Sequence, residues 1–163
     1  MVPTMNLNMA LRSGVREVVR ILRREPPIIR HEFDLNELPG LLRKDNPIIL
    51  DIGCNDGSQS LQFLKLFKDS KVYAFEPDPR AQDPFRHNVE DNRVKLFEMA
   101  VSSIDGETDF HMSNGAPSPD WKERSQRGWD LSGSIRNPKK HLNLYPWCTF
   151  DRTIKVQTKR LDT

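Results

Sequence analysis

The sequence has little of what extracellular, membrane-spanning or metal-binding proteins usually need. Its 163 residues include only two cysteines, too few for a disulfide framework, and no N-glycosylation triplet. Mean hydropathy is −0.66, and no stretch approaches the roughly 18 apolar residues of a membrane-spanning helix. The four histidines are scattered and none pairs at ligand spacing, so we expect no metal site. These absences favour an intracellular, cytoplasmic protein.

Positive charge is scarce in the middle of the chain. The formal net charge is +2, but residues 31–120 carry 9 basic and 17 acidic side chains, whereas both ends are basic. A nucleic-acid-binding protein usually carries its basic surface on the folded module. We therefore expect no nucleic-acid partner, and we interpret the basic ends as solvated faces or protein contacts.

The chain is predicted to form one domain with an N-terminal extension at residues 1–30. Apolar residues at helical spacing across 9–24 predict an amphipathic helix that packs on the domain, with a transit peptide as the alternative. The domain then covers 31–163. It begins with a short helix at 34–42, where Asp34 and Glu37 resemble a capping box, and it includes a long loop at 113–150, rich in Ser, Gly, Asn and Pro.

Strands and helices are predicted to alternate after Pro47. Residues 48–52 form a strand that is apolar on both faces, which is typical of a parallel sheet covered by helices. A helix at 58–69, a strand at 71–75, a helix at 84–92 and a strand at 94–101 follow. This order predicts an α/β fold with a Rossmann-like, doubly wound, mostly parallel sheet. After the Asp105-Gly106 turn, 107–112 is expected to return antiparallel to 94–101, and 153–158 alternates as a further strand.

The turn after the first strand carries a functional motif, ILDIGCNDG, at residues 49–57. The dinucleotide motif GxGxxG has glycines where this chain has Asn55 and Ser58, and its second glycine lets the backbone approach a pyrophosphate. A ligand with an adenosine but no pyrophosphate does not need those glycines, and S-adenosylmethionine is such a ligand. Gly53 would let the turn pass close to its methionine part, and Asp51 would contact it directly or through water.

The second motif is YAFEPDP at residues 73–79. Glu76 ends the second strand 19 residues after Gly57, near the spacing of about 20 at which a ribose-binding acid follows a glycine turn. Its carboxylate could accept hydrogen bonds from both ribose hydroxyls. Some positions of the predicted site have structural alternatives, since helix starts also favour Asn and Ser, and Ala100 could be plain core. The candidate cofactor-binding residues are Asp51, Gly53, Asn55, Gly57, Ser58, Glu76, Pro77 and Ala100.

These motifs resemble the S-adenosylmethionine-dependent methyltransferases. MAVSSIDGETDF at 99–110, VQTKRLDT at 156–163, and Phe85 and Asn88 make the FkbM type the most similar subtype, over roughly residues 46–112 and 152–163. The resemblance implies methyl transfer from S-adenosylmethionine to a hydroxyl of a small-molecule acceptor, commonly a sugar or natural product. Members continue with a fourth strand that ends in an acidic residue and that this chain does not show. We therefore expect a truncated sheet, incomplete at its C-terminal side. We also expect a chain that is poorly soluble or dimeric, binds S-adenosylmethionine weakly and does not turn over.

Several assignments stay open at this point. Asp109 and His111 follow the third strand, but we expect neither to be the general base. Cys54 is expected to be a small buried residue, and the three tryptophans are expected to anchor the long loop. A non-catalytic binding module derived from a methyltransferase is one alternative function. A nicotinamide-dependent oxidoreductase is another, which Asn55 in place of the second glycine argues against.

Overall fold

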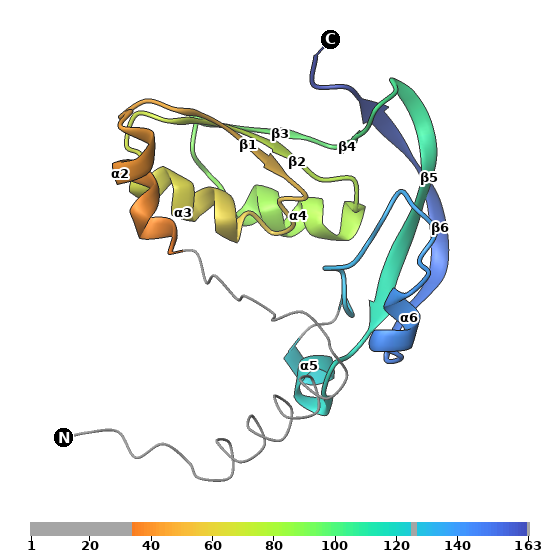
Figure 1. The fold of residues 1–163 in the computed structure, drawn as a ribbon. Coiled ribbons are helices and arrows are strands. Elements are labelled where there is room, and N and C mark those ends of the chain that lie inside the picture. Colours follow the sequence, from red (N-terminus) through yellow and green to blue (C-terminus); the bar gives the residue numbers. More distant parts are fainter. Residues whose placement is uncertain (1–33, 125–126, 163) are drawn as a thin grey trace, which may run out of the picture. The chain divides into compact units, whose positions relative to one another are not determined.

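The computed structural model describes residues 34–124 and 127–162 (Figure 1). The helix predicted at 9–24 lies outside the described residues. The described chain begins with a 3-10 turn, η1 (Leu35–Glu37), and a five-residue helix, α2 (Leu38–Leu42), whose N-cap is Glu37. The helix predicted at 34–42 is therefore divided into two short pieces.

Three parallel strands form the first sheet, in the order β1 (Ile48–Ile52), β2 (Lys71–Phe75) and β3 (Val94–Phe97). Helices α3 (Ser58–Leu66) and α4 (Pro79–Asn88) connect the strands, and Figure 1 shows both along one face of the sheet. The predicted α/β class and the parallel sheet are confirmed. Strands β1 and β2 have the predicted bounds, and α3 is three residues shorter at its C-terminal end than predicted.

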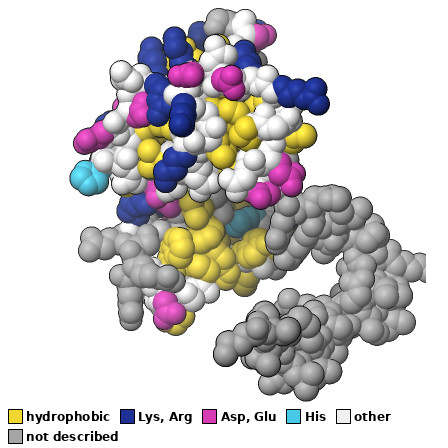
Figure 2. All heavy atoms as spheres, turned by 90° about the vertical axis from the view of Figure 1, so that its left-hand side faces the viewer, with side chains coloured by type: hydrophobic (Ala, Val, Ile, Leu, Met, Phe, Trp, Pro, Cys, Tyr) yellow, Lys and Arg dark blue, Asp and Glu magenta, His cyan; other side chains and the backbone are white. Residues whose placement is uncertain are grey.

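The two faces of this sheet differ in their covering. Side chains alternate between the faces of a strand. On the helix-covered face, Ala74 packs in a buried cluster with Phe85 of α4 and Cys54. On the other face of β1, Ile48, Leu50 and Ile52 are 66%, 48% and 54% exposed. Among the described residues no helix covers that face, so the covering predicted for both faces of β1 is not found there. Figure 2 shows hydrophobic patches between charged side chains on one side of the molecule.

Helix α4 begins five residues earlier than predicted. The Asp78 side chain caps it by accepting a hydrogen bond from Arg80 N at 3.0 Å, and Pro79 suits the first helical position. Pro84, the predicted start, lies inside the helix instead. Because proline has no N–H, the carbonyl of Arg80 loses its helical donor. Arg127 Nη1 donates to that carbonyl at 3.1 Å, which ties a distant segment to α4.

A second three-stranded sheet follows β3, in the order β4 (Ala100–Val101), β6 (Cys148–Lys159) and β5 (Gly106–Gly115). The strand predicted at 94–101 is divided into β3 and β4. The strand predicted at 107–112 lies within β5, but its predicted pairing with 94–101 is wrong, because β5 pairs antiparallel with β6. The strand predicted at 153–158 is confirmed as part of β6.

Hydrophobic packing explains this second sheet. Phe110 and Met112 of β5, Val156 of β6 and Ala100 of β4 form one buried cluster. Because β6 lies between β4 and β5, side chains from all three strands meet in this cluster. No local pattern in the sequence predicts this long-range pairing.

The segment predicted as a long loop, 113–150, contains the end of β5, the start of β6 and two short helices, α5 (Pro119–Arg124) and α6 (His141–Leu144). The Trp129 ring packs against those of Trp121 and Trp147, with centroids 4.9 Å and 5.0 Å apart. Ser134 forms an isolated bridge with His111 of β5. The tryptophans therefore anchor the segment as predicted, and these contacts hold residues 129–134 against β5.

We predict that Gly57→Ala destabilises the fold more than Gly53→Ala. Both glycines have a left-handed backbone, with φ of +82° and +80°, which costs a residue with a Cβ about 1–2 kcal/mol. A Cβ on Gly57 would also collide with the Phe85 and Val89 side chains, whereas one on Gly53 meets open space. Overpacking typically adds about 1–3 kcal/mol. Urea denaturation of the two variants measures the difference, and equal losses would contradict this description of the turn.

Candidate functional site

The turn from β1 into α3 places backbone amides at the end of the first sheet. Gly53, Asn55 and Gly57 all have positive φ, so the chain coils tightly there. The amides of Gly53 and Cys54 donate to the carbonyl of Phe75, at 2.9 Å and 3.2 Å. This pins the turn beside the last residue of β2. The next residue along the chain is Glu76.

Glu76 joins the two turns at the carboxyl ends of β1 and β2. Its Oε2 accepts a hydrogen bond from Asn55 N, and its Oε1 accepts one from Asp78 N, each at 2.8 Å. The residue is only 5% exposed. Burial raises the pKa of the carboxyl, and the two amide hydrogen bonds partly oppose that rise. An ionised carboxylate has about four lone-pair positions, so acceptor capacity remains after both bonds.

Asp51 is the second buried carboxylate, near the end of β1. Its Oδ2 accepts a hydrogen bond from Ser60 Oγ of α3 at 2.6 Å. Burial raises the pKa of the carboxyl, and the Ser60 hydrogen bond lowers it to a smaller extent. The side chain therefore links α3 to β1.

A cleft of about 130 Å³ opens beside Glu76, and four predicted site residues line it: Gly53, Asn55, Glu76 and Pro77. The other four lie elsewhere. Asp51 is bonded to Ser60, Gly57 packs under α4, Ser58 bonds to Asp56 at the start of α3, and Ala100 lies in the core of the second sheet. The sequence motifs thus converge on one cleft, which four of the eight predicted residues line.

The far wall of the cleft comes from residues that sequence reasoning missed: Phe110, Asp130, Leu131 and Gly133. Asp130 is 8% exposed and forms an ion pair with Arg127, whose Nη1 lies 3.1 Å from Asp130 Oδ2. No local pattern marks Asp130 as functional. It belongs to the site because the tryptophan cluster and β5 fix the segment that carries it.

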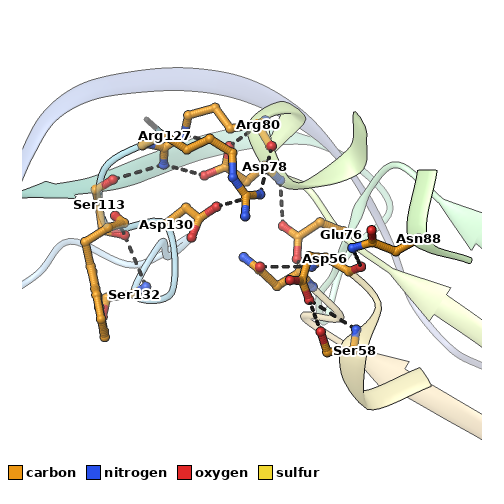
Figure 3. A network of polar contacts seen from close by, with 12 residues as sticks. Asp56, Ser58, Glu76, Asp78, Arg80, Asn88, Ser113, Arg127, Asp130 and Ser132 are labelled. Carbon is orange, nitrogen blue, oxygen red and sulfur yellow. Dashed lines mark hydrogen bonds and ion pairs between the residues drawn. The ribbon is translucent and has the colours of Figure 1, made fainter. Parts of the chain in front are cut away.

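Polar contacts join this wall to the start of α4 (Figure 3). The Arg80 guanidinium forms a 2.6 Å ion pair with Asp78 and donates to the carbonyls of Ser113 and Arg127. Arg127 in turn donates to the Arg80 carbonyl that Pro84 leaves free. Two arginines therefore bind each other's backbone, and the cleft is held between two sheets that share no strand.

Other side chains considered from the sequence lie apart from the cleft. Asp109 is exposed and paired with Lys155, and His111 Nδ1 lies 3.1 Å from Thr153 Oγ1. Cys54 is buried, and burial together with the nearby Glu76 carboxylate raises the pKa of its thiol, as expected for an inert core residue. Among the described residues, no three His, Cys, Asp or Glu side chains are grouped to hold a metal ion. No helix in the described ranges is long and apolar enough to cross a membrane.

Comparison with known proteins adds two similar sequences. The chain is 44% identical over 157 residues to 2-O-methyltransferase NoeI of Sinorhizobium fredii, covering 96% of this chain and 60% of that protein. It is 34% identical over 80 residues to methyltransferase sdnD of Sordaria araneosa, covering 47% of this chain and 29% of that protein. No family model and no solved structure match the chain. The chain thus spans less than two thirds of the length of either methyltransferase.

We predict that Asp51→Asn raises stability at neutral pH. The raised pKa means that the folded state holds a proton on Asp51 more tightly than the unfolded state, so stability falls as pH rises from about the unfolded value of 3.8 through the folded value. Asparagine keeps an acceptor for Ser60 and removes the buried charge. The unfolding free energies of variant and wild type, measured by urea at pH 7.5 and 3.5, should differ in the variant's favour only at pH 7.5. A variant less stable at pH 7.5 would contradict this.

Proposed function

We propose that this chain carries the cofactor site of an S-adenosylmethionine-dependent methyltransferase of the FkbM type, which methylates a hydroxyl oxygen of a sugar or small natural product. The observation that carries the proposal is Glu76, buried and oriented by two backbone amides beside the Gly53 turn. The similarity to two curated methyltransferases supports the reaction class.

The residues of the cleft fit this cofactor. Glu76 has lone pairs left for ribose hydroxyls, and the open space at Gly53 leaves room for a ligand to lie against the backbone. When bound, S-adenosylmethionine supplies an electrophilic methyl group on a sulfonium. The part of this chain is to bind and orient: Glu76 holds the hydroxyls, Asn55 shapes the turn, and Pro77 and Phe110 form apolar surface.

The charge of the cleft distinguishes S-adenosylmethionine from a nicotinamide dinucleotide as its ligand. The Glu76 carboxylate lines the cleft and is only 5% exposed, so the site favours a cation beside it. The sulfonium and ammonium groups of S-adenosylmethionine are cationic, whereas the pyrophosphate of a nicotinamide dinucleotide is doubly anionic. The Glu76 carboxylate and the missing second glycine both argue against the oxidoreductase alternative.

The small size of the cleft favours a second candidate function, a module that binds the cofactor without catalysing transfer. Its volume of about 130 Å³ is below the roughly 300 Å³ at which ordinary ligand pockets begin. A cofactor held there would be only partly enclosed by the described residues. A chain that bound the cofactor without turnover would act as a cofactor-binding module.

Calorimetric titration tests the proposal directly. We predict saturable binding of S-adenosylmethionine and no binding of NAD⁺ at the same concentrations. Glu76→Gln should weaken binding by about tenfold or more, because hydrogen bonds to a charged group contribute about 1.5–3 kcal/mol each. Glu107→Gln, an exposed change on β5 away from the cleft, is the matched control and should bind as wild type does. Transfer of a labelled methyl group across a panel of methyl glycosides then separates an enzyme from a binding module. Equal or tighter binding of NAD⁺ would overturn the proposal.

A further inference from the structure

One carboxylate oxygen of Asp130, a residue that lines the cleft, has no hydrogen-bond partner among the described residues. Asp130 Oδ2 is buried, the side chain is only 4% exposed, and no donor among the described residues bonds to that atom. The Arg127 guanidinium lies 3.1 Å away as an ion pair without hydrogen-bond geometry. Buried charged oxygens are nearly always hydrogen-bonded, so an exception needs an explanation. A ligand that donates a hydrogen bond would complete this site.

The position of Asp130 indicates which ligand would donate the missing hydrogen bond. Glu76 and Gly53 line the cleft from the first sheet, whereas Asp130 lines it from the segment held against β5, together with Leu131 and Gly133. On the proposed function, the cofactor is held by the first sheet. The opposite wall is then left for the molecule that approaches the methyl group.

We propose that Asp130 is the general base that accepts the proton of the acceptor hydroxyl. This inference rests on the proposed function and names a residue that neither motif contains. As the acceptor O–H proton passes to Asp130 Oδ2, an oxygen lone pair forms the new bond to the methyl carbon. The sulfur–methyl bond breaks with its electron pair going to sulfur, which becomes a neutral thioether. Charge is conserved, because one carboxylate and one sulfonium become one carboxylic acid and one thioether.

Arg127 has a positioning role in this arrangement. The Arg127 guanidinium donates a hydrogen bond to the Arg80 carbonyl at 3.1 Å. The backbone carbonyl of Arg127 accepts a hydrogen bond from the Arg80 guanidinium. Arg127 therefore holds Asp130 in place by charge, while Oδ2 keeps its lone pairs without a hydrogen-bond donor among the described residues. The charged groups that act on Asp130 are Glu76, Arg80 and Arg127.

The test compares Asp130→Asn with Asp109→Asn. Asp109 is an exposed carboxylate paired with Lys155 outside the cleft, so its variant is the matched control. We expect Asp130→Asn to bind S-adenosylmethionine within about twofold of wild type by calorimetry. Methyl transfer to glycosides, measured at saturating cofactor, should fall by about 10²–10⁴-fold. Asp109→Asn should keep the wild-type transfer rate.

A second measurement covers the case in which the wild type turns over none of the glycosides. Binding of methyl glycosides to protein loaded with S-adenosylhomocysteine is then followed by saturation-transfer NMR. We expect Asp130→Ala to lose binding that the wild type and Asp109→Asn retain.

Four results would overturn the inference. Unchanged transfer in Asp130→Asn would exclude Asp130 as the base. Loss of cofactor binding in that variant would assign Asp130 to the cofactor instead. Glycoside binding that Asp130→Ala leaves unaffected, or no glycoside binding by the wild type, would contradict an acceptor site there. By contrast, a wild type that fails to bind S-adenosylmethionine refutes the proposed function itself.

Discussion

The Glu76 carboxylate, held between the amides of Asn55 and Asp78, is the interaction on which the rest of the site depends. The parallel sheet brings the turn after β1 near the turn after β2, and Glu76 then joins the two turns by hydrogen bonds. Asn55 adopts a positive φ to present its amide, and Asp78 caps α4 with its side chain while its own amide bonds Glu76. A neutral side chain without acceptors would leave both of these amides without their partner. Glu76 therefore shapes the site as well as offering a charge to a ligand.

Burial of carboxylates at this end of the sheet works against stability. Glu76 and Asp51 both have raised pKa values because they are removed from water, and Asp130 keeps an oxygen without a hydrogen-bond donor. Such costs are typical of binding sites, where stability is lower than the same fold could reach. A cationic ligand whose hydroxyls bond to Glu76 would offset the cost of burying that carboxylate. The same charges disfavour phosphate-bearing ligands.

Local sequence predicted the first sheet and one wall of the cleft well. Strands β1 and β2 were found with the predicted bounds because short apolar runs flanked by Pro47, Gly53 and Pro77 leave little choice of boundary. The order strand–helix–strand then brings Gly53, Asn55 and Glu76 to one edge, since parallel strands end on the same side. Helix α4 was misplaced because Pro84 resembled a start, whereas the Asp78 cap decides it.

The second wall could not be predicted in this way. Asp130 lies 54 residues after Glu76 and reaches the cleft through two arginines and a cluster of tryptophans. Strand β6 pairs with both β4 and β5 only because side chains from all three strands share one core. Neither arrangement leaves a periodic pattern. Long-range packing, and not local propensity, therefore positions the residue that we assign to the reaction.

The most direct measurement of the central claim is a ¹⁵N-edited NMR titration of the chain with S-adenosylmethionine. Because Glu76 accepts from the amides of Asn55 and Asp78, a ligand that engages this carboxylate must perturb both amide resonances. The account predicts that these two amides, with that of Gly53, shift most and follow a single saturable binding curve. Binding that leaves the Asn55 and Asp78 amides unmoved, with shifts elsewhere in the chain, would contradict it.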